Sequence, residues 1–277
     1  MTAMPAAADI SPRQSGAERL ATFADRFFVP RRPDLRAWPV DAEPDIVPLS
    51  CAPYWSGRGE LDVATYATGA GPRVLLIHGW EGQASDMAAF VNPVLRRGAS
   101  VAGFDLPAHG RSGGERMSIP LAAQALVAVA RRRGPFQGVI AHSMGGAILV
   151  EAIALGLEAG AVALIAPPTH YGRRAREVAR MFGLDERQAQ TFIDLLSQRA
   201  GMPLDDVDMA RRAVTLTSPA LFVRSRDDRT VSGEEVARAA QAWPGSTHWE
   251  VDGLGHRRVL EDPGVVERVV EFVAPVN

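Results

Sequence analysis

The sequence contains no lysine, because all 30 of its basic residues are arginine. This absence excludes Schiff-base chemistry, a serine–lysine catalytic pair and a phosphate-binding loop that ends in lysine. Cysteine is nearly absent as well. Cys51 is the only one, so the chain can form neither an internal disulfide nor a cysteine cluster for a metal ion. We interpret Cys51 as a small, half-buried apolar residue.

Excess charge and long hydrophobic runs are also missing. With 30 basic and 32 acidic residues the net charge is −2, which gives no electrostatic reason to expect nucleic acid or an anionic membrane as a partner. No stretch reaches the roughly 18 apolar residues of a membrane span, and no basic segment followed by an apolar run opens the chain. We therefore expect a bacterial cytoplasmic protein without a membrane span.

The N-terminal part has its own pattern. Ser11-Pro-Arg-Gln14 is typical of a helix start, and apolar residues then recur at helical spacing up to Pro30. This amphipathic helix is expected to pack on the outside of the domain, with dimerisation or lipid contact as its rival roles. The segment from residue 30 to 53 contains six prolines and predicts an extended connector. Residues 1–57 are thus assigned to a helix and connector packed on a core.

The remaining residues, 58–277, predict a single α/β domain. Apolar strands at 74–77, 101–104, 139–141, 161–166, 219–225 and 247–251 alternate with helices at 85–97, 118–133 and 144–158. Such alternation indicates a mostly parallel sheet with helices on both faces. The interval between Ala166 and Pro219 far exceeds an ordinary connection. Because it contains helical stretches at 173–182 and 186–199, we interpret 167–218 as a helical lid inserted into the same domain.

The strongest candidate for chemistry is Ala141-His-Ser-Met-Gly145, which lies between a predicted strand and a predicted helix. A serine on such a sharp turn stands clear of its own backbone, where a nucleophile must be. Its small neighbours let strand and helix approach closely, although alanine replaces the usual first glycine. Taken alone, the motif also fits an ordinary strand–helix turn with a surface serine.

Other motifs follow in a fixed order around this serine. His78-Gly79-Trp80 ends one buried strand, Asp227-Asp228 follows the strand at 219–225, and His256 lies in a loop after the last strand. The order serine, aspartate, histidine is the one that the α/β-hydrolase fold uses. From about Glu60 to Phe272 the chain resembles that family, and in particular its serine-nucleophile, esterase-like members.

The resemblance implies roles for individual residues. Ser143 would be the nucleophile, His256 the general base, and one of the two aspartates the acid that orients the histidine. Asp228 is favoured because the family pattern Asp-x-x-Val fits Asp228-Arg-Thr-Val231, whereas Asp227 is displaced by one position. The remaining histidines near the site, His78, His109 and His142, are interpreted as structural, as is the carboxylate of Asp105.

An oxyanion hole would be formed by the backbone N–H groups of Trp80 and Met144. The Trp80 indole either walls the acyl pocket or packs under the lid. Glu81 and Gln83 follow closely and either contribute to the site or face solvent. In the lid, His170 could touch substrate. Phe182 and Phe192 are predicted to line the substrate pocket, because their apolar faces need a surface to cover.

These assignments predict a serine hydrolase that cleaves a small-molecule carboxylic ester with a small to medium acyl chain. Thioester, lactone, amide and carbon–carbon substrates suit the same residues, and so does a non-catalytic small-molecule-binding member of the fold. We expect no cofactor, no metal and no nucleic acid partner. A homodimer is compatible with the sequence.

Overall fold

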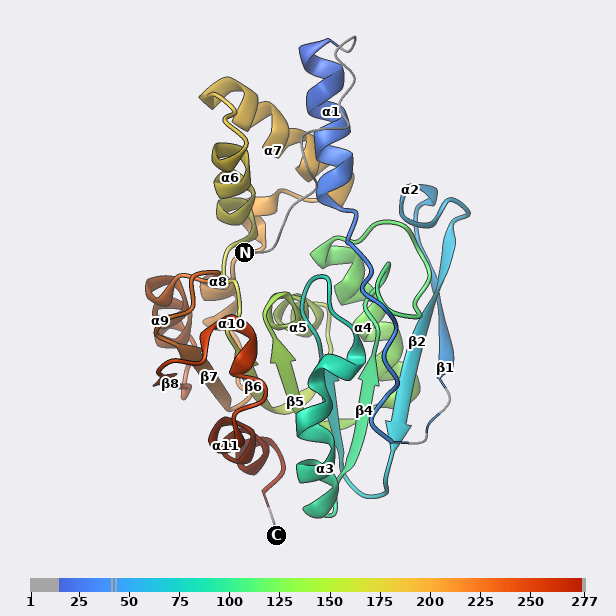
Figure 1. Cartoon of the computed structure of the whole chain (residues 1–277), viewed down its shortest axis with the longest axis vertical. Coiled ribbons are helices and arrows are strands. Elements are labelled where there is room, and N and C mark those ends of the chain that lie inside the picture. The colour runs from blue at the N-terminus through green and yellow to red at the C-terminus, as the bar shows by residue number, and fades with distance from the viewer. Residues whose placement is uncertain (1–14, 41, 43, 276–277) are drawn as a thin grey trace.

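A computed structural model describes residues 15–40, 42 and 44–275 (Figure 1). Within them, eight strands form one sheet in the order β1-β2-β4-β3-β5-β6-β7-β8. The strands are β1 (Asp45–Ser50), β2 (Glu60–Thr68), β3 (Arg73–Ile77), β4 (Ser100–Phe104), β5 (Phe136–His142), β6 (Ala159–Ile165), β7 (Ala220–Ser225) and β8 (Thr247–Val251). Strand pairing is antiparallel between β1 and β2 and between β2 and β4, and parallel across the rest of the sheet.

Helices cover both faces of this sheet, as the alternating pattern predicts. The helices around the sheet are η2 (Ala84–Met87), α2 (Pro53–Ser56), α3 (Ala88–Arg96), α4 (Ile119–Arg133), α5 (Met144–Ala154), α9 (Gly233–Ala242), α10 (Gly255–Arg258) and α11 (Pro263–Val273). In β3, Leu75 and Ile77 belong to the core on the side of α4 and α5, whereas Val74 and Leu76 belong to the core on the side of α3 and α11. The predicted mostly parallel α/β fold is therefore confirmed.

The N-terminal helix α1 (Gly16–Phe27) begins one turn later than the sequence suggests. Its N-cap is Ser15, whose hydroxyl accepts from the Glu18 backbone N–H while the Glu18 carboxylate accepts in return. The predicted cap at Ser11 lies outside the described residues. After α1 the chain runs extended down the front of the molecule to the sheet (Figure 1).

The connector contains a strand that the sequence did not predict. Strand β1 pairs with β2 from Asp45 opposite Thr65 to Ser50 opposite Glu60. It therefore belongs to the hydrolase sheet, and a boundary at residue 57 would cut through that sheet. A proline is tolerated in an edge strand, which explains how Pro48 can lie within β1.

The insertion 167–218, which the sequence analysis interprets as a lid and which keeps that name below, forms α6 (Tyr171–Met181), α7 (Glu186–Ala200), η3 (Leu204–Asp206) and α8 (Met209–Ala213). Its aromatic face packs on α1, with the ring of Phe23 4.5 Å from that of Phe182 and 4.7 Å from that of Phe192. An ion pair of 2.8 Å between Arg199 and Asp25 joins the same two helices. The N-terminal helix thus covers the apolar lid surface that the sequence assigned to the mouth of the pocket.

None of the helices formed by the described residues is long and apolar enough to cross a membrane.

Candidate active site

Ser143 occupies a sharp turn between β5 and α5. Its backbone has φ 50° and ψ −127°, a region that costs a non-glycine residue on the order of 1–3 kcal/mol. The turn is tightly enclosed, because a Cβ atom added at Gly145 would lie 2.6 Å from the carbonyl oxygen of His78. The Ser143 N–H donates to the Ile165 carbonyl at 2.8 Å. The small residues of the motif therefore hold the serine hydroxyl clear of the sheet.

His256 and Asp228 complete a hydrogen-bonded chain with this serine. The His256 Nε2 atom lies 2.9 Å from Ser143 Oγ, and its Nδ1 atom lies 2.8 Å from Asp228 Oδ2. The other oxygen of Asp228 accepts the N–H groups of Thr230 at 2.7 Å and Val231 at 3.3 Å. Burial raises the pKa of Asp228, but the bond from His256 and these two N–H groups outweigh it and leave the pKa below its usual range.

The neighbouring Asp227 has a different set of partners. Its carboxylate accepts from the Ser225 hydroxyl and from the Gly255 N–H at 3.0 Å, and these bonds hold its pKa below the usual range. It therefore supports the backbone at the start of α10, the short helix that carries His256. From β5, the His142 Nε2–H donates to the His256 carbonyl at 2.9 Å. Burial lowers the pKa of His142 to about 3, so this ring is a neutral donor.

The turn after β3 lies directly beside the serine. A Cβ atom added at Gly79 would stand 2.9 Å from the Ser143 Cβ, so glycine allows the two segments to touch. Met144 is the first residue of α5, and its N–H has no acceptor within the helix. The backbone N–H groups of Trp80 and Met144 thus lie on the two segments that flank Ser143, which are the turn after β3 and the start of α5. Their role as an oxyanion hole stays a prediction.

Two buried histidines fix the turns around the site. The Leu106 N–H donates to His78 Nε2 and the Glu81 N–H to His109 Nε2, both at 3.0 Å. Burial lowers the pKa of His78 to about 4 and that of His109 to about 3, so both rings are neutral at pH 7. Below them, Asp105 accepts from the backbone N–H groups of Ala84 and Arg111. These contacts match the structural interpretation of all three residues.

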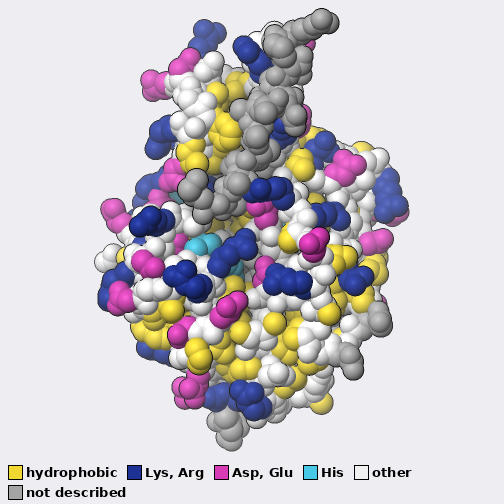
Figure 2. Space-filling model, viewed as in Figure 1, with side chains coloured by type: hydrophobic (Ala, Val, Ile, Leu, Met, Phe, Trp, Pro, Cys, Tyr) yellow, Lys and Arg dark blue, Asp and Glu magenta, His cyan; other side chains and the backbone are white. Residues whose placement is uncertain are grey.

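A cavity of about 210 Å³ opens beside Ser143 and His256. Its apolar wall includes Phe27 from α1, Trp80, Met144, and Tyr171 and Val178 from the lid. Three arginines, Arg36, Arg174 and Arg257, also line it. Figure 2 shows histidine side chains at the surface on this side of the molecule, with basic side chains around them.

The lining corrects one prediction. Phe182 and Phe192 are not among the cavity-lining residues, because both rings pack on Phe23 and Phe192 is fully buried. Phe27 takes a place in the wall that the sequence analysis did not assign to it. The signal was available, since Phe27 follows Phe23 on the same apolar stripe of α1, but the partner of that stripe could not be read from the sequence.

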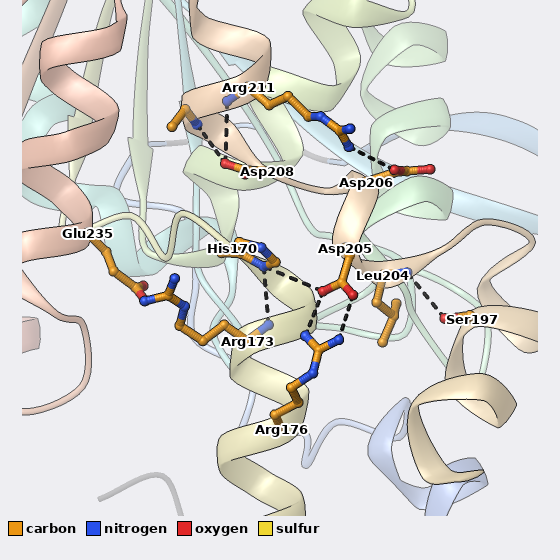
Figure 3. Close-up of polar contacts among 11 residues, drawn as sticks. His170, Arg173, Arg176, Ser197, Leu204, Asp205, Asp206, Asp208, Arg211 and Glu235 are labelled. Atoms are coloured by element: carbon orange, nitrogen blue, oxygen red, sulfur yellow. Dashed lines mark hydrogen bonds and ion pairs between the residues drawn. The ribbon is translucent and has the colours of Figure 1, made fainter. Parts of the chain in front are cut away.

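His170 lies at the base of the lid and does not line the cavity. Its Nδ1 atom accepts the Arg173 N–H at 3.2 Å and so caps α6. The carboxylate of Asp205 lies 4.0 Å away and binds both terminal nitrogens of Arg176 (Figure 3). Arg173 in turn forms a 2.8 Å ion pair with Glu235 of α9. These contacts tie the N-terminal part of α6 to η3 and α9.

Known proteins with similar sequences and structures identify the family of this chain. The pattern of the alpha/beta hydrolase family matches residues 74–269. The chain belongs to this family. It is 26% identical to a pimeloyl-[acyl-carrier protein] methyl ester esterase of Xanthomonas campestris pv. campestris, over 74% of this chain and 96% of that protein. The family match leaves α1, the connector, β1 and β2 outside it.

Solved structures of the family share the fold. An esterase from Pyrococcus furiosus has a TM-score of 0.64 at 21% identity, covering 89% of this chain and 97% of its own. A bromoperoxidase from Bacillus anthracis has a TM-score of 0.62 at 14% identity, covering 84% and 99%. At these identities the likeness establishes the fold alone, and the two names show how different the chemistry on it can be.

Proposed function

We propose that this alpha/beta hydrolase cleaves a carboxylic ester by way of an acyl-enzyme on Ser143. The observation that supports the proposal most directly is the pair of hydrogen bonds of His256, 2.9 Å to Ser143 and 2.8 Å to Asp228. Serine becomes a useful nucleophile only when a positioned base accepts its proton. A binding protein without catalysis would have no need of a strained serine in contact with a histidine that a buried carboxylate orients.

The proposed reaction has two halves. Ser143 Oγ attacks the ester carbonyl carbon while its proton moves to His256 Nε2, and the backbone N–H groups of Trp80 and Met144 hold the negative oxygen. The intermediate then expels the alcohol, which takes the proton from His256. Water repeats the sequence on the acyl-enzyme and releases the acid. Asp228 stays ionised throughout and stabilises the imidazolium.

The cavity supports a small to medium acyl chain as the substrate. Its volume is about 210 Å³ and its wall is largely aromatic and aliphatic, so it favours an apolar chain. The relative from Xanthomonas is named for the hydrolysis of a methyl ester. We infer an ester of the same general kind for this chain.

The test is turnover of p-nitrophenyl acetate, butyrate, octanoate and laurate, together with labelling of Ser143 by a fluorophosphonate. We expect turnover to be highest for butyrate or octanoate and labelling to be lost in Ser143→Ala. The His256→Ala variant should lose on the order of 10⁴-fold or more in kcat, and the Ser143→Ala/His256→Ala double variant little more. Slow labelling and no turnover in the wild-type protein would contradict the proposal and favour a binding role.

A further inference from the structure

The N-terminal arm, defined as residues 27–38, is anchored to the core at both ends. At one end Phe28 is fully buried, lies edge-on to Trp55 at 5.4 Å, and accepts the Met117 N–H at 2.8 Å through its carbonyl. At the other end Trp38 stacks on Tyr66 with ring centres 5.2 Å apart. The arm between these anchors therefore has a fixed path across the front of the sheet.

Along that path the arm contacts one loop repeatedly. The loop, residues 80–86, starts with Trp80 and is called the oxyanion loop here. Arg31 donates to the Glu81 carboxylate through both its backbone N–H and its Nε, each at 3.2 Å. The Gln83 amide accepts the Arg36 N–H at 3.0 Å and donates to the Asp34 carbonyl at 3.0 Å. Arg36 also pairs with Asp86.

The oxyanion loop needs such support, because its backbone is strained where it leaves Trp80. Glu81 has φ 55°, a value that only glycine adopts without cost. The core contributes two bonds to the backbone of this loop, from the Glu81 N–H to His109 and from the Ala84 N–H to Asp105. The side chains of Glu81 and Gln83 are held by the arm, and their burial is high, with 12% of the Glu81 side chain and 3% of Gln83 exposed.

We propose that the N-terminal arm contributes to the active site. It holds the side chains of Glu81 and Gln83, and these two positioning residues fix the position of the Trp80 backbone N–H. The inference rests on the proposed function. Groups that bind a developing oxyanion must be placed within about 0.5 Å. The arm supplies this constraint from outside the segment that the family pattern matches, residues 74–269. Phe27, at its start, adds a wall to the cavity.

The decisive variant is Glu81→Ala, which removes the carboxylate but keeps a Cβ atom and therefore the same backbone cost. Glu81→Gln keeps the acceptor for Arg31 and should restore most of the loss. Arg31→Ala, at a side chain that is 56% exposed, removes the bond from the Arg31 Nε and keeps the one from its backbone N–H, so its effect should be smaller than that of Glu81→Ala. The control is Asp45→Ala, which removes the surface ion pairs of Asp45 in the edge strand β1 with Arg132 and Arg133 of α4, none of which lines the cavity.

The first readout is oxyanion binding. We expect kcat/KM of Glu81→Ala to fall by roughly 10- to 100-fold, since a misplacement of 1 Å can cost about 10²-fold. The inhibition constant of a trifluoromethyl ketone, which forms an oxyanion on Ser143, should rise by the same factor. Binding of the matching secondary alcohol, which has no oxyanion, should change by less than about threefold. Asp45→Ala should keep all three values.

The second readout does not depend on catalysis. Amide hydrogen exchange of residues 81–86 should be faster in Glu81→Ala and Arg31→Ala than in the wild-type protein or in Asp45→Ala. Unchanged exchange together with unchanged ketone inhibition would overturn the inference. A wild-type protein that neither turns over esters nor forms the ketone adduct would contradict the proposed function instead, while the exchange comparison would still decide whether the arm fixes the loop.

Discussion

Asp227 and Asp228 are neighbours in the chain but have different partners at the site. Asp228 contacts the imidazole of His256, whereas Asp227 contacts the backbone at Gly255. An asparagine at 228 would present no anion to the imidazolium. An asparagine at 227 would still offer an oxygen to the Gly255 N–H. We therefore expect the same substitution to lower activity much more at Asp228 than at Asp227.

We expect Asp228→Asn to lower kcat by about 10⁴-fold, the loss seen when a triad carboxylate becomes an amide. Asp227→Asn should keep kcat within about tenfold of the wild type, because the loop bond survives. Steady-state kinetics on one p-nitrophenyl ester measure both. A larger loss for Asp227→Asn than for Asp228→Asn would mean that the acid has been assigned one residue too late.

Buried histidines also give stability a pH dependence. Burial lowers the pKa of His78, His109 and His142 from 6.5 to about 4, 3 and 3. Between those values and 6.5 the unfolded chain binds more protons, so the free energy of unfolding must fall as the pH falls. Each ring contributes up to about 2 kcal/mol of loss between pH 6.5 and 5. Urea unfolding at pH 7 and pH 5 measures this, and equal stabilities would contradict the pKa directions.

At the scale of elements, the strands and the serine turn were predictable because local patterns determine them. The apolar run before Ser143, the small residues after it and the glycine stops of the helices need no knowledge of distant partners. Strand β1 was not predictable in the same way, since Pro48 within it and the prolines around it are typical of a connector, and only pairing with β2 makes it a strand. Likewise the sequence identifies an apolar face on α7 but not the helix that covers it.

Because α1 covers the apolar face of the lid, the residues that should control substrate choice are not the ones that the sequence predicts. Phe192 is fully buried between α7 and α1, so Phe192→Ala should destabilise the fold by about 3–5 kcal/mol and leave the acyl-length profile unchanged. Phe27→Ala removes a ring from the cavity wall and should shift the profile towards longer chains. Melting temperatures and rates on the p-nitrophenyl series separate the two effects. A shifted profile in Phe192→Ala alone would place the pocket on the other side of α7.

For the molecule as a whole, the parallel sheet explains why residues from distant parts of the chain meet. The carboxyl ends of β3, β5, β7 and β8 lie at one edge, and Trp80, Ser143, Asp228 and His256 all follow those ends. This convergence could be predicted from the sequence, because the alternation of strands and helices already indicates a parallel sheet. The contribution of the N-terminal part could not, because nothing local in α1 indicates that Phe27 lines the cavity beside the serine.

Since Phe27 of α1 and Tyr171 and Val178 of α6 share one cavity wall, a ligand that fills the cavity should stabilise both helices at once. We expect a phosphonate with an octyl chain on Ser143 to slow amide exchange in α1 and α6 together. A methyl phosphonate on the same serine is the matched control, because it modifies the nucleophile without reaching the wall. It should slow exchange near Ser143 and leave α1 as in the free protein. If the octyl adduct protected α6 but not α1, then α1 would act as a support for the lid from outside and would have no part in binding the chain.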